Sequence, residues 1–246
     1  MLDPRERLIV ALDVSSAAAA QKIVAAVGDS AFTYKVGPQL FTVEGPKIVS
    51  DLVSSGRRVF LDLKYHDIPN TVAAAVAEAT KLHVAMLTVH AAGGGKMLRA
   101  AVEAARTVNP QTMVLAVTLL TSLGAPDLET MGIRGGVKDH VLRLAALAIS
   151  VGCHGIVTSA RESADVREEL GNEFAIVTPG VRPAGSDLRD QVRVVTPSEA
   201  IAAGASHIVV GRPITEAPDP AAEARAILGQ ISSMAQYGGS AASRSS

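Results

Sequence analysis

Residues 58–82 read RVFLDLKYHDIPNTVAAAVAEATKL, an apolar run followed by an alanine-rich segment. The run RVFLDLK is short, apolar and rich in residues that favour strands, so it predicts a β-strand. The segment NTVAAAVAEATKL has apolar residues at helical spacing and predicts a helix. Pro69, whose fixed φ suits the start of a helix, marks the turn between them. These residues therefore form one strand–helix unit.

The same unit recurs along the whole chain of 246 residues. Seven further β-rich runs begin at Leu8, Phe32, Met86, Val114, Gly155, Phe174 and His207. Strands that alternate with helices pair in parallel through helical crossovers, and near-continuous Val, Ile and Leu indicates strands covered on both faces. Eight such units in about 250 residues match a (β/α)8 TIM barrel.

One other architecture is open, a doubly wound sheet. Its glycine-rich turn G-x-G-x-x-G would follow the first strand, but residues 13–16 read DVSS there. No linker interrupts the series, so we predict a single-domain α/β protein, a (β/α)8 barrel over residues 1–235. Residues 236–246 are small and polar and predict a flexible tail.

Composition indicates the kind of partner. The chain has 23 Lys and Arg against 24 Asp and Glu, a net charge of -1, so no basic field attracts a nucleic acid or an anionic membrane. Aromatic residues are 3% of the chain and Trp is absent, so stacking platforms for nucleic acid are scarce. The expected partner is a small molecule, and neither nucleic acid nor membrane is expected.

The ends and the single cysteine bear on the compartment. Residues 1–14 carry charges of both signs and predict a first strand and no signal peptide. No apolar run approaches the roughly 18 to 20 residues of a membrane helix. Cys153 lies in an apolar stretch, which predicts a buried, inert thiol in a reducing compartment. We expect a cytoplasmic protein.

Charged residues interrupt the apolar pattern of the third strand. Residues two apart in a strand share a face, so Asp62 and Lys64 enter the barrel mouth together, and Asp67 follows where the strand ends. The structural alternative is a buried ion pair, which contributes little to stability because its charges lose their water.

Two more charges end the neighbouring strands. Asp13 closes the first and Lys35 lies in the second, which would bring both beside Asp62 and Lys64. Taken singly, Asp13 could cap the next helix, and Lys35 could be an exposed lysine at a strand end. Taken together, the four place alternating signs in one pocket.

The last two strands indicate phosphate binding. They end in TPGVRP, which includes Arg182, and VGRP, which includes Gly211 and Arg212. Glycine lets a backbone N–H approach a ligand, arginine offers a fork of donors, and barrels of this class commonly bind phosphate here. Gln191 is an additional candidate donor. The long connections 121–136 and 181–192 are candidate lids or, alternatively, plain surface loops.

The histidines give a weaker signal. His66 and His90 could both lie at strand ends, as metal-ligating histidines do in some sugar-phosphate barrels. No H-x-x-x-H or H-x-D spacing accompanies them, so no metal site is predicted.

With DLKYHDIPNT at 62–71, TPGVRP at 178–183 and VGRP at 210–213, the chain resembles the orotidine 5'-phosphate decarboxylase family of bacterial type. The likeness runs from about Leu8 to about Leu228. D-x-K-x-x-D alone also occurs in related sugar-phosphate epimerases and hexulose-phosphate synthases. Its continuation into I-P-N-T, together with T-P-G-V-R-P, is much more specific.

The resemblance implies a cofactor-free decarboxylase that converts orotidine 5'-phosphate (OMP) to UMP and CO2 in pyrimidine synthesis. Lys64 would place its ammonium beside C6 of the pyrimidine, and Asp62 would lie next to the departing carboxylate. Lys35 would belong to the charged network and reach the ribose, whose hydroxyls Asp13 would bind. Thr121, beside Ser122, would contact the pyrimidine.

The resemblance also implies a phosphate-binding set and a homodimer. The phosphate set would be Arg182, Gln191, Gly211 and Arg212. Asp67, Ile68 and Thr71 would reach the neighbouring subunit's site. Two rivals are open: a metal-dependent sugar-phosphate epimerase or aldolase of the same barrel group, and a non-catalytic nucleotide-binding barrel.

Overall fold

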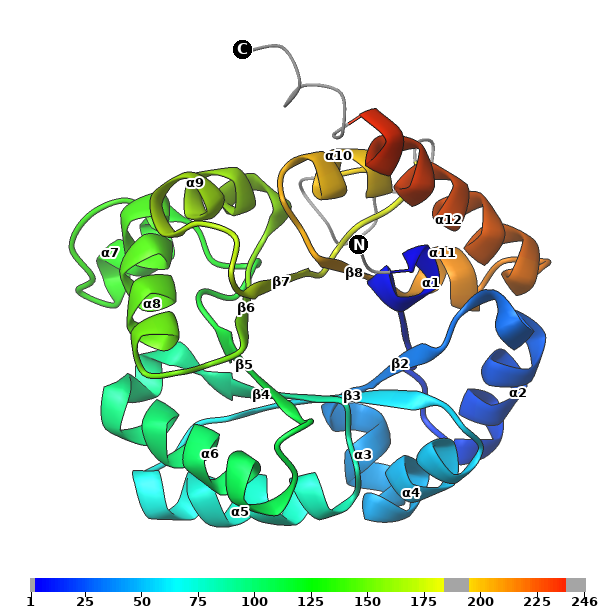
Figure 1. Cartoon of the computed structure of the whole chain (residues 1–246), viewed down its shortest axis with the longest axis horizontal. Helices are drawn as coiled ribbons and strands as arrows, with labels where there is room; N and C mark the ends of the chain where they lie inside the picture. Colours follow the sequence, from blue (N-terminus) through cyan, green and yellow to red (C-terminus); the bar gives the residue numbers. More distant parts are fainter. Residues whose placement is uncertain (1–2, 184–194, 238–246) are drawn as a thin grey trace, which may run out of the picture.

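Eight parallel strands close into a barrel in the computed structural model of the chain, which describes residues 3–183 and 195–237 (Figure 1). Strand β1 pairs with both β2 and β8, so the sheet has no free edge. The prediction of a (β/α)8 barrel is therefore confirmed, and the doubly wound alternative is wrong. The strands are β1 Leu8–Ala11, β2 Thr33–Val36, β3 Arg58–Tyr65, β4 Met86–His90, β5 Met113–Val117, β6 Gly155–Val157, β7 Ala175–Thr178 and β8 His207–Val210.

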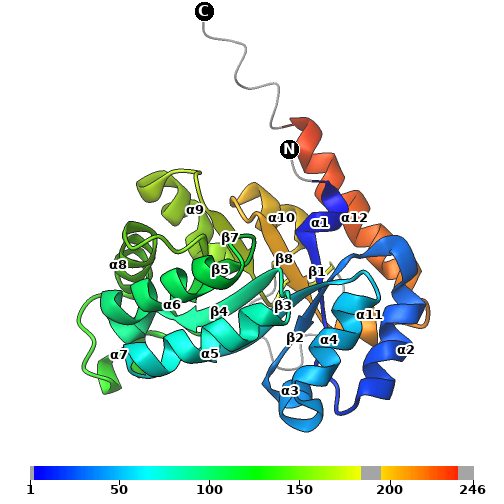
Figure 2. The same cartoon turned by 60° about the horizontal axis from the view of Figure 1, so that its bottom comes forward.

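Helices surround the strands (Figure 2). Several begin at proline, whose fixed φ and missing N–H suit a first helical turn. They are α1 Pro4–Arg7, α2 Ala17–Val27, α3 Pro38–Glu44, α4 Pro46–Ser54, α5 Pro69–Lys81, α6 Gly94–Val108, α7 Ala125–Thr130, α8 Val137–Ser150, α9 Ala160–Leu170, α10 Pro197–Ala202, α11 Arg212–Thr215 and α12 Pro220–Tyr237, with 3-10 turns η1 Gly28–Ser30 and η2 Ala91–Gly93.

The barrel has two apolar layers. On one face of each strand, side chains such as Val10, Leu61 and Leu87 belong to the large core shared with the helices. On the other face, a smaller cluster fills the barrel itself, because alternate residues of a strand point inward. That inner cluster is Ile9, Ala11, Phe60, Met86, Leu115, Val117, Val157, Val177 and Val209.

The inward-facing rows continue into polar residues at the carboxyl ends of the strands. Asp13, Asp62, Thr88 and Gly211 each come two residues after an inner-layer residue of the same chain segment. Two residues is the repeat of a strand, so these positions meet at one mouth of the barrel. The alternation of inward- and outward-facing residues along each strand therefore places these polar residues together at one site.

The structure also bears on the predictions for Cys153, for the two long connections and for the C-terminal tail. Cys153 is buried as predicted, and burial raises the pKa of its thiol to about 12. The connection after β5 includes helix α7, where the sequence indicated only a long link. Helix α12 includes Tyr237, and most of the predicted tail and of the 181–192 connection lies outside the described residues. Within residues 3–183 and 195–237, no helix is long and apolar enough to cross a bilayer.

Candidate active site

Four charged side chains form a continuous row across the mouths of β1, β2 and β3. Lys35 Nζ lies 2.6 Å from Asp13 Oδ1 and 4.0 Å from Asp62 Oδ2. Lys64 Nζ lies 2.8 Å from the same Asp62 Oδ2. The structure therefore brings together the four residues that the sequence singled out, in the order Asp13, Lys35, Asp62, Lys64.

The row decides between the functional and the structural interpretations of these residues. Ser16, not Asp13, caps helix α2 by accepting from the backbone N–H of Ala19. Lys35 is only 9% exposed, so it is not a solvated lysine at a strand end. The side chain of Lys64 is 32% exposed against 12% for Asp62, so this ion pair opens to the mouth and is not sealed in the core.

A fifth polar residue, Thr88 on β4, completes the row. Its hydroxyl donates to Asp62 Oδ1 at 3.0 Å and accepts from the Lys64 backbone N–H at 2.9 Å. Thr88 is fully buried. Sequence reasoning missed it because threonine is an ordinary strand residue; the only available signal was its place two residues after the inner-layer Met86.

Asp67, Ile68 and Thr71 do not join this row. All three are exposed, and Ile68 retains 67% of its accessible surface. Asp67 accepts a hydrogen bond from the backbone N–H of Ile68 at 2.6 Å, and no ion pair of Asp67 occurs among the described residues. Within the described part of one chain, the last acid of the D-x-K-x-x-D motif thus forms no ion pair with Lys64.

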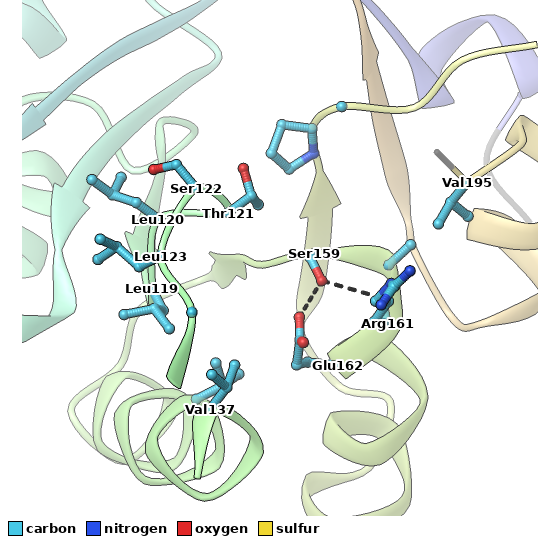
Figure 3. Close-up of a pocket in the computed structure, with 15 residues that line it drawn as sticks. Leu119, Leu120, Thr121, Ser122, Leu123, Val137, Ser159, Arg161, Glu162 and Val195 are labelled. Carbon is cyan, nitrogen blue, oxygen red and sulfur yellow. Dashed lines mark hydrogen bonds between the residues drawn. The ribbon is translucent and has the colours of Figure 1, made fainter. Parts of the chain in front are cut away.

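A pocket of about 330 Å³ lies between the ends of β5, β6 and β7 (Figure 3). Thr121 and Ser122 both line it, and their side chains point to different sides of the loop after β5. The Ser159 hydroxyl on the opposite wall donates to the Glu162 carboxylate. Hydroxyl groups and apolar side chains line the pocket together, which suits a flat heterocycle with polar edges.

The described residues that were predicted to bind phosphate follow the neighbouring strands β7 and β8. Gly211 precedes α11, and a Cβ there would lie 3.5 Å from the Cβ of Ala11, two residues before Asp13. Arg182 is 7% exposed, and its backbone N–H donates to Val195 O at 3.1 Å. Arg212 begins α11. Gln191 lies outside the described residues.

Two histidines, His66 and His90, lie near Lys64. The rings of His66 and His90 stack with centroids 5.2 Å apart. Burial lowers the pKa of His90, and the nearby charges of His66 and Lys64 lower it further. In the described part of the chain, no three His, Cys, Asp or Glu side chains form a group that could hold a metal ion.

The family model and the relatives that match this chain indicate the same family. Residues 6–227 match the family model described as "Orotidine 5'-phosphate decarboxylase / HUMPS family". Orotidine 5'-phosphate decarboxylase of Moorella thermoacetica is 51% identical over 92% of this chain and 92% of its own. The enzyme of the same name from Hydrogenovibrio crunogenus is 47% identical over 90% of this chain and 94% of its own.

A solved structure supports the same conclusion. The crystal structure of orotidine 5'-phosphate decarboxylase from Lactobacillus acidophilus superposes with a TM-score of 0.83 at 38% identity, covering 92% of this chain and 99% of its own. The resemblance that the sequence motifs indicate is therefore confirmed over nearly the whole barrel. The chain belongs to the orotidine 5'-phosphate decarboxylase family.

Proposed function

We propose that this chain decarboxylates OMP to UMP and CO2, with the row Asp13–Lys35–Asp62–Lys64 as its reaction centre. The observation that carries the proposal is the placement of the Lys64 ammonium, 2.8 Å from Asp62 and open to the mouth. Two cations and two carboxylates alternate there, so the row holds its charges in place before substrate arrives. In many enzymes, charge that is already in place before the reaction makes the largest single contribution to the rate enhancement.

The reaction requires charge stabilisation of this kind. Breaking the bond between C6 and the carboxylate leaves an electron pair in the plane of the pyrimidine, where the ring π system cannot delocalise it. The Lys64 ammonium stabilises that pair and then transfers a proton to C6, which forms UMP; solvent returns a proton to Lys64. No cofactor is needed for this sequence of steps.

The rest of the substrate would occupy the neighbouring strand ends. The pyrimidine would lie in the pocket with Thr121 or Ser122, and the ribose hydroxyls would meet Asp13 and Lys35. Gly211, Arg212 and Arg182, with Gln191 from the connection after β7, would hold the phosphate. Binding energy from these remote contacts can then support the chemical step.

The proposed enzyme is a cytoplasmic homodimer. Asp67, Ile68 and Thr71 are exposed on one chain, so a second copy of the chain can reach all three. We propose that these three residues complete the site of the partner subunit, so that each Lys64 lies between its own Asp62 and the partner's Asp67. The buried thiol of Cys153 suits a reducing compartment.

Loss of OMP absorbance, followed with protein dialysed against EDTA, tests the reaction. Steady turnover without added metal is expected. Activity that depends on added metal would favour the sugar-phosphate epimerase or aldolase alternative, and binding of UMP without turnover would favour a nucleotide-binding barrel.

Mixing two inactive variants tests the shared site. Lys64→Ala and Asp67→Ala protein, mixed in equal amounts and allowed to exchange subunits, should recover about a quarter of wild-type activity, because half of the dimers are hybrids with one intact site. Lys64→Ala mixed with itself is the control. No recovery despite demonstrated exchange would contradict sharing of Asp67.

A further inference from the structure

We propose that the Thr88 hydroxyl is a positioning residue for decarboxylation: one side-chain oxygen holds both the backbone of Lys64 and the carboxylate of Asp62. This inference rests on the proposed function, because it concerns how the same reaction centre is held. It assigns a role to β4, which supplies none of the residues that the sequence motifs indicate.

The backbone of Lys64 is in an unusual conformation. Its φ is 51°, in the left-handed region that side chains other than glycine rarely adopt. The pairing of β3 with β4 shifts register between Leu61 and Tyr65, so the regular ladder is interrupted at Lys64. The Lys64 N–H donates to Thr88 Oγ1 at 2.9 Å instead of to a backbone carbonyl. The side chain of Thr88 therefore replaces a missing ladder contact.

Thr88 also contacts the carboxylate of Asp62. Thr88 Oγ1 donates to Asp62 Oδ1 at 3.0 Å, while Asp62 Oδ2 accepts from Lys64 Nζ at 2.8 Å. The Lys64 N–H can only donate and an ionised carboxylate can only accept, so the single hydroxyl proton of Thr88 points to Asp62. The contacts form a closed ring from the backbone of Lys64, through Thr88 and Asp62, to its own ammonium.

Burial makes this ring difficult to replace. Thr88 is fully buried and Asp62 is 8% exposed, so water cannot readily reach the atoms that Thr88 contacts. Without the hydroxyl, the Lys64 N–H and Asp62 Oδ1 would both lose their partner, and the strained backbone could relax together with a rotated carboxylate. The Lys64 ammonium would then shift, and a displacement of about 1 Å costs roughly 100-fold in rate.

Thr88→Val tests the proposal because it keeps the shape and removes only the hydroxyl. We expect kcat to fall roughly 10- to 100-fold and KM for OMP to stay within about twofold, since ribose and phosphate contacts are elsewhere. Thr88→Ser, which restores the hydroxyl, should recover most of kcat. Thr33→Val is the matched control: Thr33 is a fully buried strand threonine whose hydroxyl has no partner among the described residues.

A second readout does not depend on turnover. Exchange of the Lys64 amide proton with solvent, followed by NMR, should accelerate about tenfold or more in Thr88→Val and not in Thr88→Ser. Should the wild type fail to turn over OMP, the proposed function fails, while this exchange still tests the inference. Thr88→Ala, compared by the same exchange measurement, replaces Thr88→Val if the latter does not fold.

Three results would overturn the role of Thr88. The first is wild-type kcat in Thr88→Val. The second is a Thr88→Ser variant as slow as Thr88→Val, because size and not the hydroxyl would then matter. The third is a loss that lies wholly in KM, which would place Thr88 in substrate binding and not in positioning Lys64.

Discussion

At the amino end of the barrel, half-buried arginines donate to backbone carbonyls, whereas at the carboxyl end charged side chains contact one another. Arg167 donates from Nε to Gly204 O at 3.0 Å and from Nη1 to Phe174 O at 2.9 Å. Arg7 donates to Ser206 O and Ala205 O, just before β8. By contrast, the carboxyl end holds the ionic row of Asp13, Lys35, Asp62 and Lys64.

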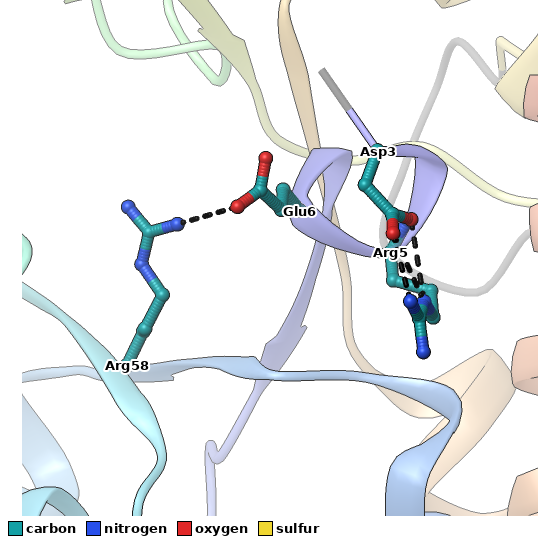
Figure 4. A network of polar contacts seen from close by, with 4 residues as sticks. All are labelled: Asp3, Arg5, Glu6 and Arg58. Carbon is teal, nitrogen blue, oxygen red and sulfur yellow. Dashed lines mark hydrogen bonds and ion pairs between the residues drawn. The ribbon is translucent and has the colours of Figure 1, made fainter.

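The difference separates stability from chemistry. A guanidinium that satisfies several carbonyls fixes loops and has little capacity left for a ligand. A row in which each charge is paired with another charge holds those charges in place for a substrate with charges of its own. Surface ion pairs also occur around α1, such as Glu6 with Arg58 at 3.3 Å and Asp3 with Arg5 at 2.8 Å (Figure 4). They neither fix backbone carbonyls nor belong to the ionic row, and exposed pairs of this kind contribute little to the free energy of unfolding.

The largest effect on activity is expected from removing the ammonium of Lys64. We expect Lys64→Ala to lower kcat by roughly 10³-fold or more, because a preorganised charge at the reacting carbon is lost. Its free energy of unfolding should change by less than about 1 kcal/mol, since the Lys64 side chain is one-third exposed and Asp62 keeps the Thr88 hydroxyl as a partner. Steady-state assays and urea unfolding measure both quantities. Lys47→Ala, at a lysine with a 78% exposed side chain, is the control.

The amino end should respond in the opposite way. Arg167→Met keeps an unbranched apolar stem but removes the guanidinium, which lies over the Phe174 ring and donates to the carbonyls of Gly204, Gly171 and Phe174. We expect the free energy of unfolding to fall by about 3 kcal/mol, with kcat per folded molecule unchanged.

Arg106→Met, at an exposed arginine of α6, should leave both quantities at the wild-type value. If Arg167→Met lost activity while keeping its stability, the division between the two ends of the barrel would be wrong.

His207 extends the comparison to pH. It begins β8, and burial, with the charges of Arg58 and Arg7, lowers its pKa to about 4. Between pH ~6.5 and ~4 the unfolded chain binds a proton here that the folded chain does not, so stability falls as pH falls through this window. The change is about 3 kcal/mol at most. Urea unfolding from pH 7 to pH 5 should show a shallower decline for His207→Leu, and equal declines would contradict this explanation.

The sequence predicted the barrel because strand and helix periods are local properties. It also identified Asp62 and Lys64, since charges within an apolar strand break a visible pattern. It could not identify Thr88, whose role depends on the register shift beside Lys64, nor Arg167, whose partners come from separate segments. Residues whose function depends on long-range geometry, and whose type is ordinary for their element, leave no signal in one sequence.

Gly37 offers the finest test of how tightly the ionic row is packed. A Cβ at this position would lie 3.0 Å from Lys35 Nζ and 3.1 Å from Asp13 Oδ1. The backbone of Gly37 has φ -95° and ψ -179°, which alanine adopts without strain, so the cost falls on the ion pair alone. We expect Gly37→Ala to lower kcat/KM for OMP about tenfold, as a shift of a few tenths of an ångström moves Lys35 and Asp13 together.

The free energy of unfolding should change little in the same variant. Replacing glycine by alanine at an allowed φ removes freedom from the unfolded chain and stabilises by about 0.4–1 kcal/mol, which offsets part of the crowding. Gly229→Ala is the matched control, because a Cβ there, on α12, meets nothing within 4 Å. That variant should be more stable by up to about 1 kcal/mol with unchanged kcat/KM. Were both variants to keep full activity, Lys35 and Asp13 would not need their present separation for substrate binding, and the part of the row essential for activity would shrink to Asp62 and Lys64.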